Sequence, residues 1–188
     1  MKKILTLLLT ILLLNILVAY AVDITMGYSA IVRSDEVVAF RTYVFKNFTA
    51  NGTGTIDTIK VYAHSDIDGL EVASFYESGG TLSTRDYETI GDISSGYSSH
   101  SVSIDIQEGD YIGFHAINGY WENDSVITAT AWGSNVDKIP CSNDSFSNYV
   151  NCKISFYAEG TVEGGITWNT AEISKWNEAE ISKWNGVE

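Results

Sequence analysis

The chain has 188 residues, of which 24 are acidic and 11 basic, so its formal net charge is −13. This balance disfavours nucleic acid and anionic membrane surfaces as partners, because phosphate groups are bound by clusters of Lys and Arg. The length is enough for one domain with a proper hydrophobic core.

Residues 1–21 have the pattern of a signal peptide. Lys2 and Lys3 precede the apolar run 4–18, and 19–21 fits a small-x-small cleavage site. An uncleaved anchor is the alternative, but the run is short of the roughly 20 residues that span a bilayer. We therefore expect a secreted or cell-surface protein with no membrane span after signal removal, which also lowers the charge from −13 to −15.

Residues 22–159 contain a series of short β-like segments separated by Gly, Asn, Asp and Ser. No long apolar period of 3.6 residues is present, and about nine strands at roughly ten-residue spacing predict an antiparallel β-sandwich, jelly-roll-like in type. The Gly-rich residues 160–165 predict a linker, and residues 166–188 a separate short tail. The expected strands include 37–45, 56–63, 72–76, 101–106, 110–117, 125–132 and 152–158.

Asp66, Asp68 and Glu71 surround Gly69 and offer oxygen ligands of the kind that calcium prefers. The spacing also resembles the Glu-x-Asp-x-x-Glu pattern of laminarinase-like β-sandwich glycosidases, in which two carboxylates perform catalysis, although Asp66 replaces the first Glu. The leading interpretation is an Asp–Gly turn between two strands. No cofactor is expected other than calcium.

Catalysis finds little support elsewhere, and no catalytic residue is predicted. His64, His100 and His115 are isolated from one another in the sequence, and no phosphate-binding Gly loop is present. His64 and His115 lie in strand-like segments, where a hydrogen-bonded sheet histidine is the simpler interpretation.

The sharpest aromatic cluster is 120–124, which we expect in a loop at the end of a strand. Exposed Tyr and Trp rings beside Asn and Asp form platforms for sugar rings, so Tyr120, Trp121, Asn123 and Asp124 are the candidate ligand site. The alternative is that these rings cover an edge of the core.

Cys141 and Cys152 are the two cysteines of the chain, with ten residues between them. In an oxidising compartment this spacing predicts one disulfide closing a surface loop. In the chain-entropy model, a disulfide closing a loop of this size would stabilise the folded state by on the order of 3 kcal/mol. A zinc site is the alternative, but two thiolates without a neighbouring His do not complete a ligand set.

The tail repeats one phrase, which places three tryptophans at a spacing of eight residues. In an extended chain the tryptophans face one side and the isoleucines the other, whereas in a helix the tryptophans would spiral. Short strands and turns are favoured over a helix, although Asn–x–x–Glu spacings imitate helix starts. The expected docking or assembly residues are Trp168, Ile173, Trp176, Ile181 and Trp184.

The segments 173–177 and 181–187 read Ile-Ser-Lys-Trp-Asn and Ile-Ser-Lys-Trp-Asn-Gly-Val. They resemble the tandem Ile-x-Lys-x-Asn-Gly-Val phrases of poorly characterised secreted or phage-type β-sandwich surface proteins, and 108–114 is similar to their sandwich domains. The resemblance implies a surface protein and assigns no activity.

Two classes of function follow. In the first, the chain is a non-enzymatic adhesive or carbohydrate-binding protein whose partner is a glycan or another surface protein, and the tail is a docking element. In the second, it is a structural subunit of an extracellular filament or layer, and the tail joins copies into a homo-oligomer. A glycosidase using Glu71 is a distant third.

Overall fold

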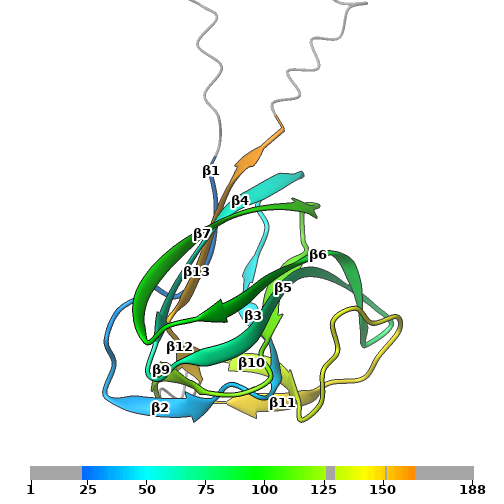
Figure 1. Ribbon diagram of the computed structural model, residues 1–188. Helices are drawn as coiled ribbons and strands as arrows, with labels where there is room; N and C mark the ends of the chain where they lie inside the picture. Colours follow the sequence, from blue (N-terminus) through cyan, green and yellow to red (C-terminus); the bar gives the residue numbers. More distant parts are fainter. Residues whose placement is uncertain (1–22, 126–129, 151, 164–188) are drawn as a thin grey trace, which may run out of the picture. The chain divides into compact units, whose positions relative to one another are not determined.

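Alternating apolar and polar residues form thirteen strands in the part of the chain that the structure describes (Figure 1). The computed structural model describes residues 23–125, 130–150 and 152–163, which belong to one compact unit spanning 21–163. The expected signal, the repeat tail and the five docking residues of that tail lie outside the described residues. The strands are β1 (Asp23–Gly27), β2 (Asp35–Val38), β3 (Thr42–Thr49), β4 (Gly54–Ala63), β5 (Ile67–Ser78), β6 (Thr81–Ile93), β7 (Gly96–Ile106), β8 (Tyr111–His115), β9 (Tyr120–Asp124), β10 (Thr130–Ser134), β11 (Ser147–Val150), β12 (Lys153–Ile154) and β13 (Phe156–Val162).

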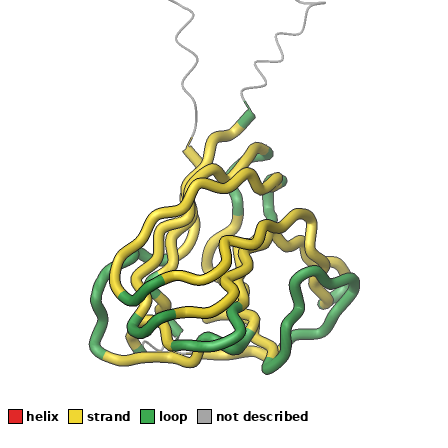
Figure 2. Tube along the Cα trace, in the orientation of Figure 1, coloured by secondary structure: helices red, strands yellow, loops and turns green. Residues whose placement is uncertain are grey.

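These strands form two antiparallel sheets. Sheet A has seven strands in the order β1-β13-β4-β9-β12, with β2 paired to β9 and β7 to β4. Sheet B has six strands in the order β11-β10-β3-β8-β5-β6. The strands are drawn in yellow in Figure 2. Among the described residues, no helix is long and apolar enough to cross a membrane. The expected all-β, two-sheet architecture is confirmed, and the expected number of strands, about nine, is too low.

The main core lies between the two sheets and is dominated by aromatic side chains. Phe114 of sheet B stacks on Phe156 of sheet A, with ring centroids 4.3 Å apart and planes at 16°. Trp121 of sheet A meets the same Phe114 ring edge-on at 5.2 Å. Because aromatic rings bury the most apolar area per side chain, these contacts hold the two sheets face to face.

A second, smaller core lies on the outer face of sheet B. It is covered by residues 135–146, here called the strap, which is the long loop between β10 and β11 (Figure 2). Ile139 and Phe146 of the strap pack on Val44 and Phe75 of the sheet. The hydroxyl of Thr42 donates to the carbonyl of Val136 at 3.0 Å and accepts from the amide of Lys138 at 3.0 Å. The strap is therefore tied to sheet B by apolar packing and by hydrogen bonds between the Thr42 hydroxyl and the strap backbone.

The predicted disulfide between Cys141 and Cys152 is wrong, because both cysteines are free thiols. Cys141 packs in the strap core on the outer face of sheet B, whereas Cys152 is buried in the main core between the sheets. Sheet B separates the two packing environments, and burial raises the pKa of Cys152 to about 12. Cys152 therefore behaves as a small apolar core residue.

Two predicted boundaries also shift. The expected strand 37–45 is broken, because β2 pairs in sheet A and β3 in sheet B, with residues 39–41 between them. The expected linker 160–165 begins inside β13, whose residues Gly160, Thr161 and Val162 pair with β4. Gly160 fits there because a Cβ atom would lie 2.2 Å from the carbonyl oxygen of Thr55, so close strand packing explains this glycine.

Candidate functional site

The outer face of sheet A carries the most distinctive polar and aromatic surface of the described residues. Along β4, Ile59, Val61 and Ala63 are buried, so Lys60 and Tyr62 point to the opposite side. The alternation in the expected strand 56–63 already indicated that Lys60 and Tyr62 point to the same side. It could not indicate which residues of other strands lie beside them, because that depends on how the strands pair.

Three tyrosines gather on this face around one ion pair. Tyr97 of β7 lies directly opposite Tyr62, and Tyr157 of β13 directly opposite Lys60. Side chains opposite each other in an antiparallel pair have Cβ atoms about 5 Å apart, so Tyr97 lies beside Tyr62 and Tyr157 beside Lys60. The three tyrosines on this face are here called the tyrosine face. Tyr97 is 57% exposed.

Lys60 lies at the centre of the tyrosine face. Its ammonium donates to Glu159 at 2.6 Å, and this hydrogen bond raises the pKa of Lys60. The phenols of Tyr97 and Tyr157 act in the same direction, which places both near the ammonium. The face thus combines ring surfaces with a cation and a carboxylate that can bond to hydroxyl groups.

The outer face continues from Tyr62 to His64, which follows the end of β4. Glu36 of β2 and Glu122 of β9 lie directly opposite each other, an arrangement of like charges that is unfavourable by itself. The His64 ring bridges them, with Nε2 2.8 Å from Glu36 Oε2 and Nδ1 2.9 Å from Glu122 Oε1. His64 and Glu36 are half-exposed. A ligand on this face would therefore meet an imidazole and a carboxylate beside the rings.

Of the four residues expected to bind a ligand at 120–124, only Tyr120 is exposed. The segment is strand β9 and not a loop. Trp121 is fully buried, so the alternative interpretation of this ring as a core residue holds, and its indole N–H has no acceptor among the described residues. Asn123 is buried as well. Tyr120 lies on the outer face together with Glu122, because both alternate with inward-pointing Trp121.

Asp124 is committed to a structural contact. Its carboxylate accepts hydrogen bonds from the backbone and hydroxyl of Ser34 at 3.0 and 2.9 Å. It also forms an ion pair at 2.9 Å with Arg33, and the side chain of Arg33 is only 2% exposed. The backbone N–H of Ser34, together with Arg33, lowers the pKa of Asp124. These bonds anchor the loop before β2 to sheet A.

The structure does not assemble the expected calcium site from Asp66, Asp68 and Glu71. Asp66 accepts from the backbone N–H of Ser95 at 2.8 Å, and Asp68 forms an isolated bridge with Asn118. The segment is not a turn between strands either, since it lies at the start of β5. There Gly69, with a φ of +61°, falls within a break in the pairing register with β6.

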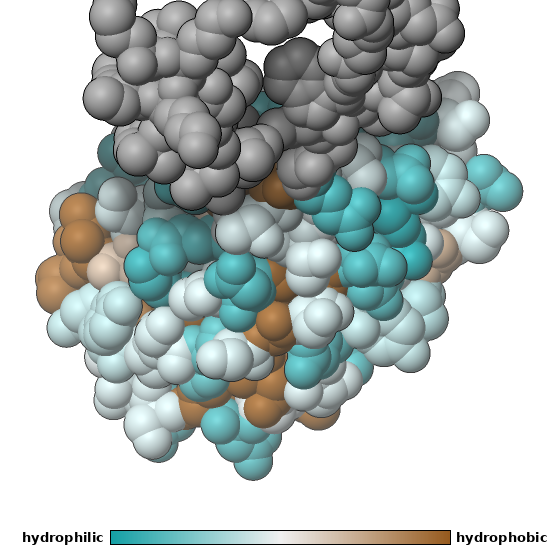
Figure 3. All heavy atoms as spheres, turned by 90° about the horizontal axis from the view of Figure 1, so that it is seen from above, coloured by the Kyte–Doolittle hydropathy of each residue, from teal (hydrophilic) through white to brown (hydrophobic). Residues whose placement is uncertain are grey.

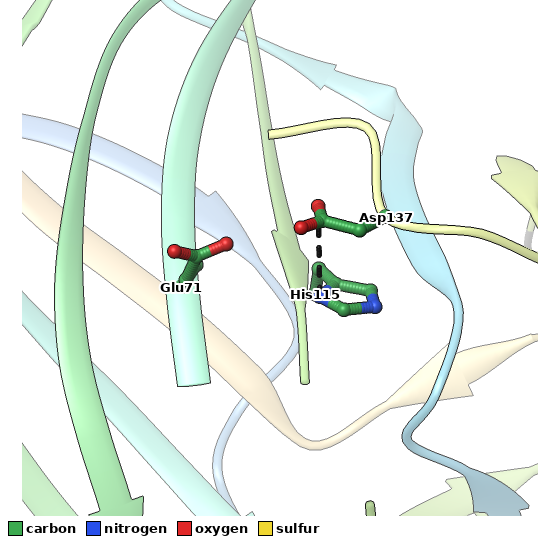
Figure 4. A group of neighbouring side chains, drawn as sticks. All are labelled: Glu71, His115 and Asp137. Carbon is green, nitrogen blue, oxygen red and sulfur yellow. Dashed lines mark ion pairs between the residues drawn. The ribbon is translucent and has the colours of Figure 1, made fainter. Parts of the chain in front are cut away.

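Glu71 instead belongs to a different group. Its carboxylate shares a region on the outer side of sheet B with His115 of β8 and Asp137 of the strap, and the three candidate ligand atoms lie within 4.8 Å of one another (Figure 4). Neither His115 nor Asp137 was expected to bind a metal, because they are far from Glu71 in the sequence. These three residues are the one candidate metal-ligand group within the described ranges.

A cleft of about 430 Å³ lies elsewhere, between β4, β6 and β7. Its polar groups already have structural partners: Arg85 is paired with Asp110, and Asp86 accepts the backbone N–H of Asp105 at 2.8 Å. The Asp86 contact joins β6 to β7, and the Arg85 contact joins β6 to the turn before β8. The cleft therefore offers few unsatisfied groups to a ligand.

No protein-family model matches the chain, and neither a curated protein nor a solved structure shows significant similarity to it. Function must therefore be argued from the surface itself. On the side shown in Figure 3, hydrophobic residues form small separate groups among polar ones.

Proposed function

We propose that this chain is a non-enzymatic secreted or cell-surface protein that binds carbohydrate through the outer face of sheet A. The observation that carries the proposal is the grouping of Tyr62, Tyr97 and Tyr157 around Lys60. Aromatic rings stack on the apolar faces of sugars, while charged and amide groups bond to sugar hydroxyls. An antiparallel β-sandwich that presents aromatic rings on the outer face of one sheet suits this role.

The charge of the chain narrows the ligand class. With a net charge of −13, the protein repels polyanions such as sulfated or uronic-acid-rich polymers. The single cation of the tyrosine face, Lys60, is already paired with Glu159. We therefore propose a neutral glycan, contacted by the three rings and by His64 and Glu36 beside them.

A glycan array probed with the full chain tests the proposal, followed by calorimetry with the best neutral glycan. Tyr97→Ala should weaken binding at least tenfold, about 1.4 kcal/mol, as expected for a central aromatic contact. The matched control is Tyr87→Ala, because Tyr87 is 45% exposed and lies on β6 of the other sheet. An array without signal, or equal loss in both variants, would contradict the proposal.

Assembly through the tail is the second candidate, favoured by the eight-residue repeat of residues 167–188. Here the chain would be a subunit of an extracellular filament or layer. Size-exclusion chromatography and electron microscopy of the chain with and without residues 165–188 separate the candidates. Assembly that survives the deletion would refute the tail as the assembly element.

A further inference from the structure

Three side chains from distant parts of the chain meet at the edge of the strap. Glu71 on β5 and His115 on β8 are directly opposite each other in the register of sheet B, so their side chains share one face. Asp137 reaches them from the strap, which crosses that face (Figure 4). Its position is held by its own hydrogen bond, since Asp137 Oδ1 accepts the backbone N–H of Ile139 at 2.8 Å.

The distances between these side chains suit a shared cation better than a direct contact. His115 Nδ1 lies 3.6 Å from Asp137 Oδ1, which is too long for a hydrogen bond. Two ligands bound tetrahedrally at roughly 2.1 Å from a metal are roughly 3.4 Å apart. The observed separation is therefore close to the edge of a tetrahedral site, and Glu71 offers a carboxylate oxygen within 4.8 Å of both ligand atoms.

The imidazole of His115 is the most buried of the three candidate ligands. The residue is 8% exposed, and its ring makes no hydrogen bond to the residues that the structure describes. A metal ion bound at Nδ1 would bond to the nitrogen that Asp137 Oδ1 approaches only to 3.6 Å.

We propose that Glu71, His115 and Asp137 bind a divalent transition-metal cation of the Zn²⁺ type, with the remaining coordination position open to water. One imidazole and two carboxylates suit Zn²⁺, whereas Ca²⁺ takes oxygen ligands. The ligands have outer supports, because Thr89 donates to Glu71 Oε1 at 3.2 Å and Ile139 to Asp137. The site is independent of the tyrosine face.

Binding at this position would join the strap to β5 and β8. A ligand that binds only the folded state stabilises it in proportion to the logarithm of its concentration over Kd. Zn²⁺ should therefore raise the melting temperature of the full chain, while Ca²⁺ at the same concentration should not.

Isothermal titration of the full chain with Zn²⁺ tests the site, with melting curves as a second readout. We expect one saturable site in the wild-type chain, and at least tenfold weaker binding in Asp137→Asn and in His115→Gln. Asp137 has a half-exposed side chain, so its variant should still fold. His100→Gln is the matched histidine control, because His100 lies on β7 of sheet A with Ser98 as its hydrogen-bond partner, and it should bind Zn²⁺ as the wild type does.

Binding of Zn²⁺ to a cysteine thiolate could also produce a signal in the titration. Cys152 is buried with a pKa raised to about 12, and Cys141 is partly buried. Cobalt(II) substituted for zinc separates the two, because a thiolate ligand adds a charge-transfer band that oxygen and nitrogen ligands lack. The proposal is overturned by the absence of saturable Zn²⁺ binding, by a thiolate band that Cys141→Ser removes, or by wild-type affinity in Asp137→Asn.

Discussion

Replacement of Trp121 by Ala tests whether this residue is a core side chain or a ligand platform. Trp121 is fully buried against Phe114, whereas its neighbour Tyr120 is 42% exposed on the opposite side of β9. A buried Trp removes about 200 Å² from water, which at about 25 cal/mol per Å² corresponds to about 5 kcal/mol. Ala retains part of this area, so Trp121→Ala should cost about 3–5 kcal/mol.

Such a loss is large against a typical folding stability of about 5–15 kcal/mol. Using about 3–4 °C for each kcal/mol in a domain of this size, the melting temperature should fall by about 10–20 °C. Tyr120→Ala is the matched control and should change stability by less than about 0.5 kcal/mol. Trp121→Phe should cost less than Trp121→Ala, because it keeps an aromatic ring and removes an indole N–H that has no acceptor among the described residues.

Urea unfolding followed by far-ultraviolet circular dichroism measures these differences without interference from the tail tryptophans. A Trp121→Ala chain that unfolds at the wild-type urea concentration but loses glycan binding would refute the reasoning. It would mean that the ring contributes to a surface and not to the core.

Three further predictions concern pH, thiols and backbone strain. Ser34 and Arg33 hold the pKa of Asp124 below its unfolded value of about 3.9. The contribution of Asp124 to the stability of the folded state is therefore complete above that value and is lost as pH falls through the folded pKa. Acid titration followed by circular dichroism should therefore show a smaller loss of stability in Asp124→Asn, and an unchanged acid profile would contradict this. A reductant should leave the melting temperature unchanged, and a thiol reagent should modify Cys141 before Cys152; a linked peptide in mass spectrometry would contradict the free thiols. Gly119→Ala should cost more than about 1 kcal/mol in urea unfolding, since φ is +106° and the new Cβ would lie 2.3 Å from a carbonyl oxygen; equal stability to the wild type would contradict it.

The sequence predicted strands best where apolar residues alternate. The expected 56–63 and 101–106 lie within β4 and β7, whose burial follows the alternation. Strand β6, with thirteen residues, was missed because it lies at the edge of sheet B and carries many polar residues. Strand β9 was taken for a loop, because Glu122 and Asn123 are polar and the local pattern cannot show that both are buried.

The candidate sites were harder to predict for a related reason. The sequence grouped Glu71 with Asp66 and Asp68, which lie close to it in the chain, whereas the structure brings its carboxylate near His115 and Asp137. The tyrosine face was missed because each of its rings looks ordinary within its own strand. Only the pairing of β4 with β7 and β13 brings the rings together.

The sequence by itself determined the all-β class of the domain, its acidic character and the eight-residue repeat, because strand alternation, charge and repetition are local properties of a chain. The tertiary structure decided that Cys141 and Cys152 stay apart, that Trp121 points inward, and that His115 meets Glu71 and Asp137. These outcomes depend on strand register and on which loop covers which sheet face. Both are set by contacts between residues far apart in the sequence, such as the pair of Arg33 with Asp124 across 91 positions.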